Sequence, residues 1–179
     1  MKYQKWHIGT ASEQDTALLK EAGYPSLLAT VLAARGITTS EAAAEALERE
    51  TSLTISPMLM RDMDKAVARI QKALANDETI AVFGDYDVDG VTATALLYQH
   101  LKGMGASAKC MLPSREGDGY GLSKNAIQSI YDKGCRLIVT VDNGIAAIEE
   151  AEFAASLGVD LIVTDHHLPH EVLPKAVAV

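Results

Sequence analysis

The sequence predicts an α/β fold in which a helical N-terminal leader precedes a parallel, doubly wound (Rossmann-like) sheet of about five strands. Two observations support this prediction. From residue 79 onward, apolar runs alternate with stretches of helical periodicity, and the runs begin about every 25–30 residues, as βαβ units do. These runs are apolar throughout rather than alternating, which is typical of parallel strands that are covered on both faces.

The leader is expected to contain three helices, because capping residues, proline and glycine mark where each begins and ends. They are predicted over 12–22, over 25–34, and from 39 or 40 onward. Turn residues and Pro57 then indicate a linker over 51–58. We therefore expect two parts, a helical leader over 1–58 and a second domain over 59–179.

Four strands of the second domain are predicted over 79–84, 106–112, 136–141 and 160–164, and a fifth begins at 176–179. Right-handed crossovers between consecutive parallel strands give the doubly wound sheet. Apolar residues recur at helical spacing over 61–75, which predicts a helix that packs one face against the sheet.

The first strand leads into GDYDVDG, which places three carboxylates, Asp85, Asp87 and Asp89, ahead of a helix-like run. At a separation of ~5 Å and an effective dielectric of ~20, each pair repels by about 3 kcal/mol. A divalent cation bound between the carboxylates would make their total interaction energy favourable. The alternative is a solvated acidic turn in which Asp89 caps the following helix.

Two later runs end in residues of the same kind. The third ends in Asp142-Asn143-Gly144, and the fourth in Asp165-His166-His167. Parallel strands place their carboxyl ends at one edge of the sheet, where open α/β sheets build their sites. Oxygen ligands with one or two imidazoles suit Mn²⁺ or Mg²⁺ better than a structural zinc. Since His166 and His167 are adjacent, they cannot both point the same way from an extended chain, and we expect one to bind metal and the other to face substrate.

The glycine-rich segment PSREGDGYGL follows the second strand and contains Arg115. Its guanidinium could clamp a phosphate group. The alternative is a surface salt bridge to Glu116 or Asp118.

Composition excludes several classes of protein. The chain has 179 residues and a net charge of −8, which is unusual for a protein that binds nucleic acid by itself. No apolar run approaches the ~20 residues of a membrane span, and no signal peptide is evident. Cys110 and Cys135 are expected to be reduced core residues, so the predicted location is the cytoplasm.

GDYDVDG, VDNG and DHH, in this order, resemble motifs I, II and III of the DHH phosphoesterase superfamily. MRDMDKAVARI, PSR, GYGL and DHHLP extend the resemblance to RecJ-type single-strand-specific exonucleases over nearly the whole chain. The resemblance implies 5′→3′ hydrolysis of single-stranded DNA with two Mn²⁺ or Mg²⁺ ions, in DNA repair and recombination. A single-strand-binding protein or a helicase is an implied partner, and a membrane is not.

The resemblance also implies residue roles. Asp87 and Asp89 would each bind one ion, Asp142 would bridge both ions, and His166 would bind the second. Asp85 would be auxiliary, and Asp165 and His167 would be catalytic. His167 and Arg115 would contact substrate phosphate. Many superfamily members have a histidine four residues before the DxD, where this chain has Phe83, so one possible ligand is missing.

Two other functions stay open at this point. One is a DHH phosphoesterase that acts on short oligonucleotides or a nucleotide phosphate, and the other is a catalytically silent binding module. The leader argues against the first, and the retained motif carboxylates argue against the second. Because the RecJ pattern continues into a fourth motif and another domain, we expect residues 1–179 alone to be inactive.

Overall fold

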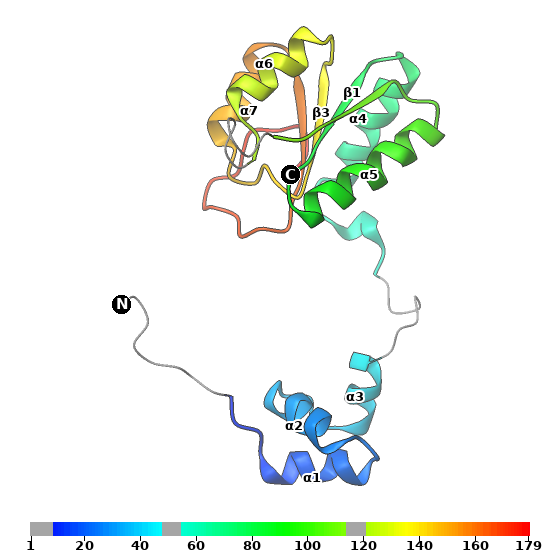
Figure 1. Cartoon of the computed structure of the whole chain (residues 1–179), viewed down its shortest axis with the longest axis vertical. Coiled ribbons are helices and arrows are strands. Elements are labelled where there is room, and N and C mark those ends of the chain that lie inside the picture. Colours follow the sequence, from blue (N-terminus) through cyan, green and yellow to red (C-terminus); the bar gives the residue numbers. More distant parts are fainter. Residues whose placement is uncertain (1–8, 48–54, 114–120) are drawn as a thin grey trace. The chain divides into compact units, whose positions relative to one another are not determined.

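The protein divides into two compact units, Met1–Thr54 and Ile55–Val179. The structure, a computed structural model, describes residues 9–47, 55–113 and 121–179. The first unit contains the predicted helices α1 (Glu13–Glu21), α2 (Ser26–Ala34) and α3 (Ser40–Leu47) (Figure 1). Side-chain hydroxyl groups cap the N-termini of two of these helices. Ser12 accepts a hydrogen bond from Asp15 N at 3.3 Å, and Thr39 accepts one from Ala42 N at 3.2 Å.

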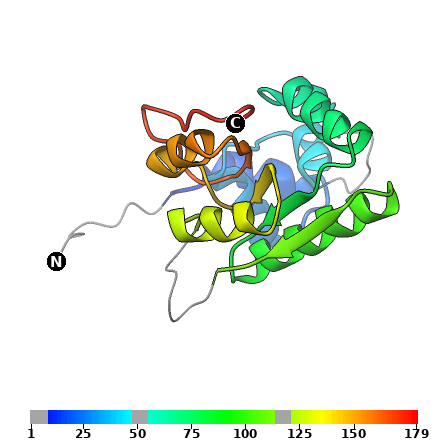
Figure 2. The same cartoon turned by 90° about the horizontal axis from the view of Figure 1, so that it is seen from above.

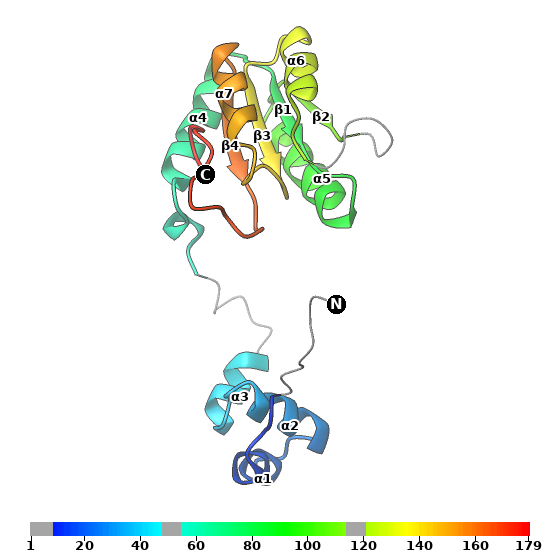
Figure 3. The ribbon, with the colours of Figure 1, turned by 90° about the vertical axis from the view of Figure 1, so that its left-hand side faces the viewer.

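The second unit is a parallel α/β sheet, as predicted. Its strands lie in the order β2-β1-β3-β4, and every pairing is parallel (Figure 3). The elements are η2 (Pro57–Leu59), α4 (Met63–Ala75), β1 (Ile80–Phe83), α5 (Val88–Gly103), β2 (Ala108–Met111), α6 (Lys124–Asp132), β3 (Leu137–Val141), α7 (Ile148–Ser156) and β4 (Asp160–Thr164).

Helices cover both faces of the sheet (Figure 2). α4 and α5 pack on the face that includes Ile80 and Val82, whereas α6 and α7 pack on the face that includes Ala81 and Phe83. All four of these β1 residues are fully buried, which explains why the central strands are apolar at consecutive positions. No helix among the described residues has the length and apolar character needed to cross a membrane.

Two expectations about the sheet edges were wrong. The run Ala176–Val179 does not form a strand. It pairs with β4 through one parallel bridge, between Ala178 and Ile162, in which Val177 N donates to Leu161 O at 2.8 Å and Val163 N donates to Ala178 O at 3.0 Å. Cys135 is buried as expected, but Cys110 is exposed, since β2 lies at the edge of the sheet.

An ion network fastens α4 to the end of the sheet where the strands begin. The Arg69 guanidinium donates to Asp160 at 2.5 Å and to Glu78 at 2.6 Å. Asp160 is the first residue of β4, and Glu78 lies just before β1. The network therefore ties three segments together at the edge opposite the candidate site.

Candidate metal centre

The carboxylates of GDYDVDG occupy three different environments after β1. Asp85 is fully buried, and its Oδ1 accepts a hydrogen bond from Tyr86 N at 2.7 Å. Asp87 is exposed and caps α5 by accepting from Gly90 N at 3.0 Å. Asp89 is exposed in the first turn of α5. The alternative with Asp89 as the cap is therefore wrong, although the positive end of the helix favours both carboxylates.

Two glycines allow this arrangement. A Cβ atom on Gly84 would overlap Thr94 and the Gly90 carbonyl oxygen, and one on Gly90 would overlap the backbone of Asp85. The first turn of α5 thus packs directly on the backbone that leaves β1, which is possible only without side chains at these two positions. This contact fixes where Asp87 and Asp89 lie relative to the sheet.

Asp142 follows β3 in a left-handed backbone conformation, with φ 61°. Its side chain is buried, and Oδ1 lies 2.8 Å from His166 Nε2. Burial raises the pKa of the Asp142 carboxyl group, and the nearby Asp87 charge adds to this, while the contact with His166 opposes it. A buried carboxyl group beside other acids is a good ligand for a cation, because the cation offsets both the cost of burying the charge and the repulsion between the acids.

Asp165 joins the loops that follow β3 and β4. Its Oδ2 accepts from Ile145 N at 3.0 Å, and its Oδ1 accepts from the backbone N–H groups of His166 at 2.8 Å and His167 at 3.2 Å. Oδ1 also lies 2.7 Å from His167 Nδ1. Burial raises the pKa of Asp165, but these hydrogen bonds outweigh it, and the pKa lies below its ordinary value. The carboxylate is therefore engaged in holding the two loops.

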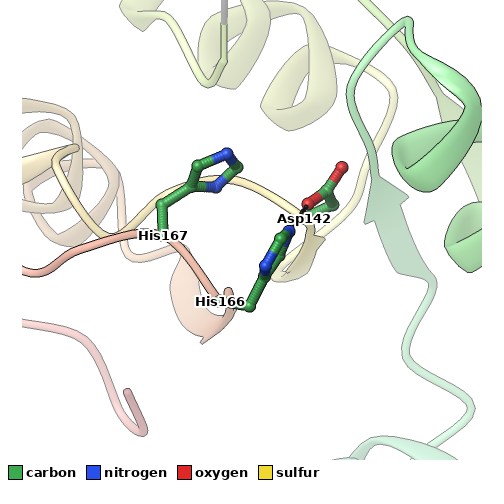
Figure 4. Close-up of side chains that lie close together, drawn as sticks. All are labelled: Asp142, His166 and His167. Atoms are coloured by element: carbon green, nitrogen blue, oxygen red, sulfur yellow. Dashed lines mark ion pairs between the residues drawn. The ribbon is translucent and has the colours of Figure 1, made fainter. Parts of the chain in front are cut away.

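Both imidazoles point to the same side of the chain, contrary to expectation (Figure 4). Their ring centroids lie 4.7 Å apart, and ligand-type atoms of Asp142, His166 and His167 all lie within 4.8 Å of one another. The reason is the turn that Asp165 forms with the two N–H groups that follow it, so that the chain is no longer extended after β4. The hydrogen bond with Asp165 raises the pKa of His167.

A pocket of about 590 Å³ opens between α5 and the ends of β3 and β4. Its lining residues are Asp89, Thr92, Ala93, Leu96, Asp142, Thr164, Asp165 and His166. The structure thus brings Asp89, Asp142 and His166 into one pocket, with Asp87 close enough to affect the pKa of Asp142. Asp85 lies in the interior, and Arg115 lies outside the described residues.

Sequence reasoning missed Asn143, which is buried next to Asp142. Its Nδ2 donates to the carbonyl oxygens of Phe83 at 3.3 Å and Val141 at 3.0 Å, so the amide bridges the ends of β1 and β3. Its position directly after Asp142 was the only signal in the sequence. The partner carbonyl groups belong to the backbone and leave no trace in residue types.

The donor set fits a hard divalent cation. It consists of carboxylate oxygens and imidazole nitrogens, the ligands that Mn²⁺ and Mg²⁺ accept. Within the described part of the chain, Asp85 Oδ2 and Asn143 Oδ1 are also buried without a hydrogen-bond partner, so further oxygen atoms at the same strand ends remain unsatisfied.

Known proteins are similar to this chain in sequence. The single-stranded-DNA-specific exonuclease RecJ of Bacillus subtilis (strain 168) is 37% identical over 98% of this chain. RecJ of Escherichia coli (strain K12) is 40% identical over 88% of it. The chain spans only 22% and 27% of the length of these two relatives.

Solved structures agree with the fold. A crystal structure of exonuclease RecJ bound to manganese superposes with a TM-score of 0.62 at 34% identity, over 69% of this chain and 32% of that one. RecJ from Thermus thermophilus in complex with Mn²⁺ gives 0.67 at 25% identity, over 94% and 23%. Residues 79–179, more than half of the chain, match the DHH family, N-terminal domain. The protein therefore belongs to the DHH family.

Proposed function

We propose that the second unit carries the metal-binding part of a 5′→3′ exonuclease that hydrolyses phosphodiester bonds in single-stranded DNA. The observation that carries the proposal is the meeting of carboxylates and imidazoles from three strand ends at one sheet edge. Relatives that are 37% and 40% identical are named single-stranded-DNA-specific exonucleases, which supports the choice of substrate.

The proposed ligands are Asp89, Asp142 and His166, which line the pocket, and Asp87, whose charge acts on Asp142. Asp87 and Asp89 would hold one ion each, Asp142 would be shared by both ions, and His166 would hold the second. When bound, Mn²⁺ or Mg²⁺ activates water and neutralises charge on the phosphodiester. Solved RecJ structures with Mn²⁺ and with Mg²⁺ support this choice of metals.

His167, Asp165 and Arg115 have supporting roles in this proposal. Asp165 fixes the orientation of the His167 ring through Nδ1, and His167 contacts the phosphate or donates a proton to the leaving oxygen. Arg115 clamps a substrate phosphate. Asp85, which is fully buried, acts as an auxiliary residue behind the ligands.

The proposed cellular setting follows from the substrate. DNA repair and recombination in the cytoplasm expose single strands, where a helicase or a single-strand-binding protein would present them. Residues 59–179, which lie within the second unit, are the proposed DHH domain, and residues 1–58 are the proposed leader.

The test uses the natural full-length protein with single-stranded oligonucleotides labelled at the 5′ or the 3′ end. We expect release of 5′-terminal nucleotides in Mn²⁺ or Mg²⁺, and none in EDTA. Asp142→Asn should lose more activity than the about 10–100-fold that removal of an outer-shell partner costs. Asp64→Asn, at an exposed position in α4, should lose none.

Three outcomes would contradict the proposal. Degradation from the 3′ end would reverse the polarity, and activity in EDTA would remove the metal. Binding of single strands without cleavage in either metal would identify a silent binding module. Equal losses from Asp85→Asn and Asp142→Asn would show that the bridging ligand is misassigned.

A further inference from the structure

One wall of the metal-centre pocket is uncharged. Thr92, Ala93 and Leu96 of α5 form it, and they line the same pocket as Asp142 and His166. From residue 90 to 101 the helix contains no lysine, arginine or carboxylate. The pocket therefore joins a strongly polar side to a side that offers mainly apolar surface.

Leu96 is the prominent side chain of this wall. It is 75% exposed, although leucine is normally buried. The Thr92 hydroxyl group lies 2.7 Å from Val88 O and 3.2 Å from Asp89 O, so its proton is committed to the helix backbone. The wall thus presents methyl and methylene groups to the pocket and no free hydrogen-bond donor.

We propose that this wall binds the nucleoside next to the scissile phosphodiester, with the base on Leu96 and the sugar against Thr92 and Ala93. The inference rests on the proposed function. Asp89, Thr92 and Leu96 are spaced at i, i+3 and i+7, so they lie on one face of the helix. Leu96 lies about 10 Å along the axis from Asp89, which is within reach of a nucleoside attached to a phosphate held at the ligands.

A phosphate group does not suit this wall, because the wall has no cation and no donor to offer. A nucleobase does suit it, since every base has an apolar face that can pack on an aliphatic side chain. Such contacts tolerate any base, as stacking surfaces for single strands do. The protein should therefore cleave the four nucleotides with similar kcat/KM.

The experiment compares Leu96→Ala with Leu27→Ala in the natural full-length protein with Mn²⁺. Leu27 is the matched control, because it is 79% exposed and lies on α2 of the first unit. Substrates are single-stranded oligonucleotides with all bases present, or with an abasic residue at the first or second position from the 5′ end.

For the complete oligonucleotide, Leu96→Ala should raise KM about fivefold or more, the low end expected for loss of one stacked base. The change in kcat should be smaller. For the wild type, one of the two abasic substrates should raise KM as much as Leu96→Ala does on the complete oligonucleotide. On that abasic substrate, Leu96→Ala should have the same KM as the wild type. Leu96→Phe, which keeps a large apolar side chain, should have the wild-type KM. Leu27→Ala should have the wild-type KM and kcat on every substrate.

Equal KM values for Leu96→Ala and wild type would overturn the inference, and so would equal effects of Leu96→Ala on complete and abasic strands. Mn²⁺ binding by titration calorimetry separates this result from failure of the proposed function. If the wild type binds Mn²⁺ but neither binds nor cleaves single strands, the proposed function is wrong irrespective of Leu96.

Discussion

At the scale of single residues, the site is held by side chains whose partners are backbone groups. Asp165 accepts from three backbone N–H groups, and Asn143 donates to two carbonyl groups. Asp142 is different, since its backbone is left-handed and its carboxyl group lies close enough to Asp87 for the two charges to interact. Asp165 and Asn143 stabilise the loops. Asp142 places a carboxylate, whose charge destabilises the folded protein, where a cation can bind.

Asp142→Asn should therefore stabilise the metal-free protein. In the wild type, the pKa of the Asp142 carboxyl group is raised in the folded state. The folded protein is therefore destabilised as the pH rises through this pKa and the carboxyl group ionises, so the Asp142 charge costs stability at neutral pH. Asparagine also tolerates the left-handed conformation well. We expect the unfolding midpoint at pH 7.5 in EDTA to rise by about 2–4 °C, equivalent to about 1 kcal/mol. A lower midpoint would contradict this, and at saturating Mn²⁺ the order should reverse.

His167→Gln should have a pH-dependent cost in the metal-free protein. The raised pKa of His167 makes its contribution fully present below about 6.5, and lost as the pH rises through the folded-state pKa. The lowered pKa of Asp165 keeps that carboxylate charged at both pH values compared here. Urea unfolding should show a larger cost of His167→Gln at pH 5.5 than at pH 9. In an Asp165→Asn background this difference should shrink, because the hydrogen bond with Asp165 is the largest cause of the raised pKa, while the charges of Asp142 and Asp87 remain. An undiminished difference would refute the pairing.

At the scale of elements, the contact between β1 and α5 positions the first group of ligands. Gly90 belongs to the helix, yet an added Cβ atom would meet the Asp85 backbone. Gly103, at the other end of the same helix, has nothing within 4 Å of such an atom. The two glycines therefore make a matched pair.

Gly90→Ala should lower the free energy of unfolding by about 2 kcal/mol or more, because backbone must move, and should weaken Mn²⁺ binding. Gly103→Ala should instead stabilise by about 0.5–1 kcal/mol, since alanine favours a helix. Chemical denaturation and metal titration of both variants check this. Similar stabilities for the two would show that the close packing is not needed.

The elements also show what a sequence can predict. The apolar runs gave the strands within two residues of their ends, because burial on both faces of a parallel sheet demands such runs. The turn at Asp165 and the hydrogen bonds of Asn143 could not be predicted from the sequence, because they depend on backbone partners from other strands. The short pairing of Ala178 could not be predicted either, since an apolar segment does not reveal how far it runs beside its neighbour.

At the scale of the whole molecule, each unit has its own hydrophobic core. Residues from 66 to 179 form the two clusters on either face of the sheet, and a separate cluster includes Leu19, Ala29 and Leu32. Residues 55–179 should therefore fold alone, with a cooperative thermal transition within about 3 °C of that of the sheet unit in the 179-residue chain. Circular dichroism of both proteins checks this, and loss of the cooperative transition would contradict it.

The crowding of acidic groups at the strand ends has a consequence for turnover of the protein in the cell. An ion that binds only the native state stabilises it by about 2.7 kcal/mol at one hundred times its dissociation constant. Proteases remove unfolded molecules, so a change of about 1–2 kcal/mol alters abundance several-fold. We expect manganese starvation to shorten the half-life of the protein in a pulse-chase experiment. Asp142→Asn, which no longer needs the ion for stability, should keep its half-life.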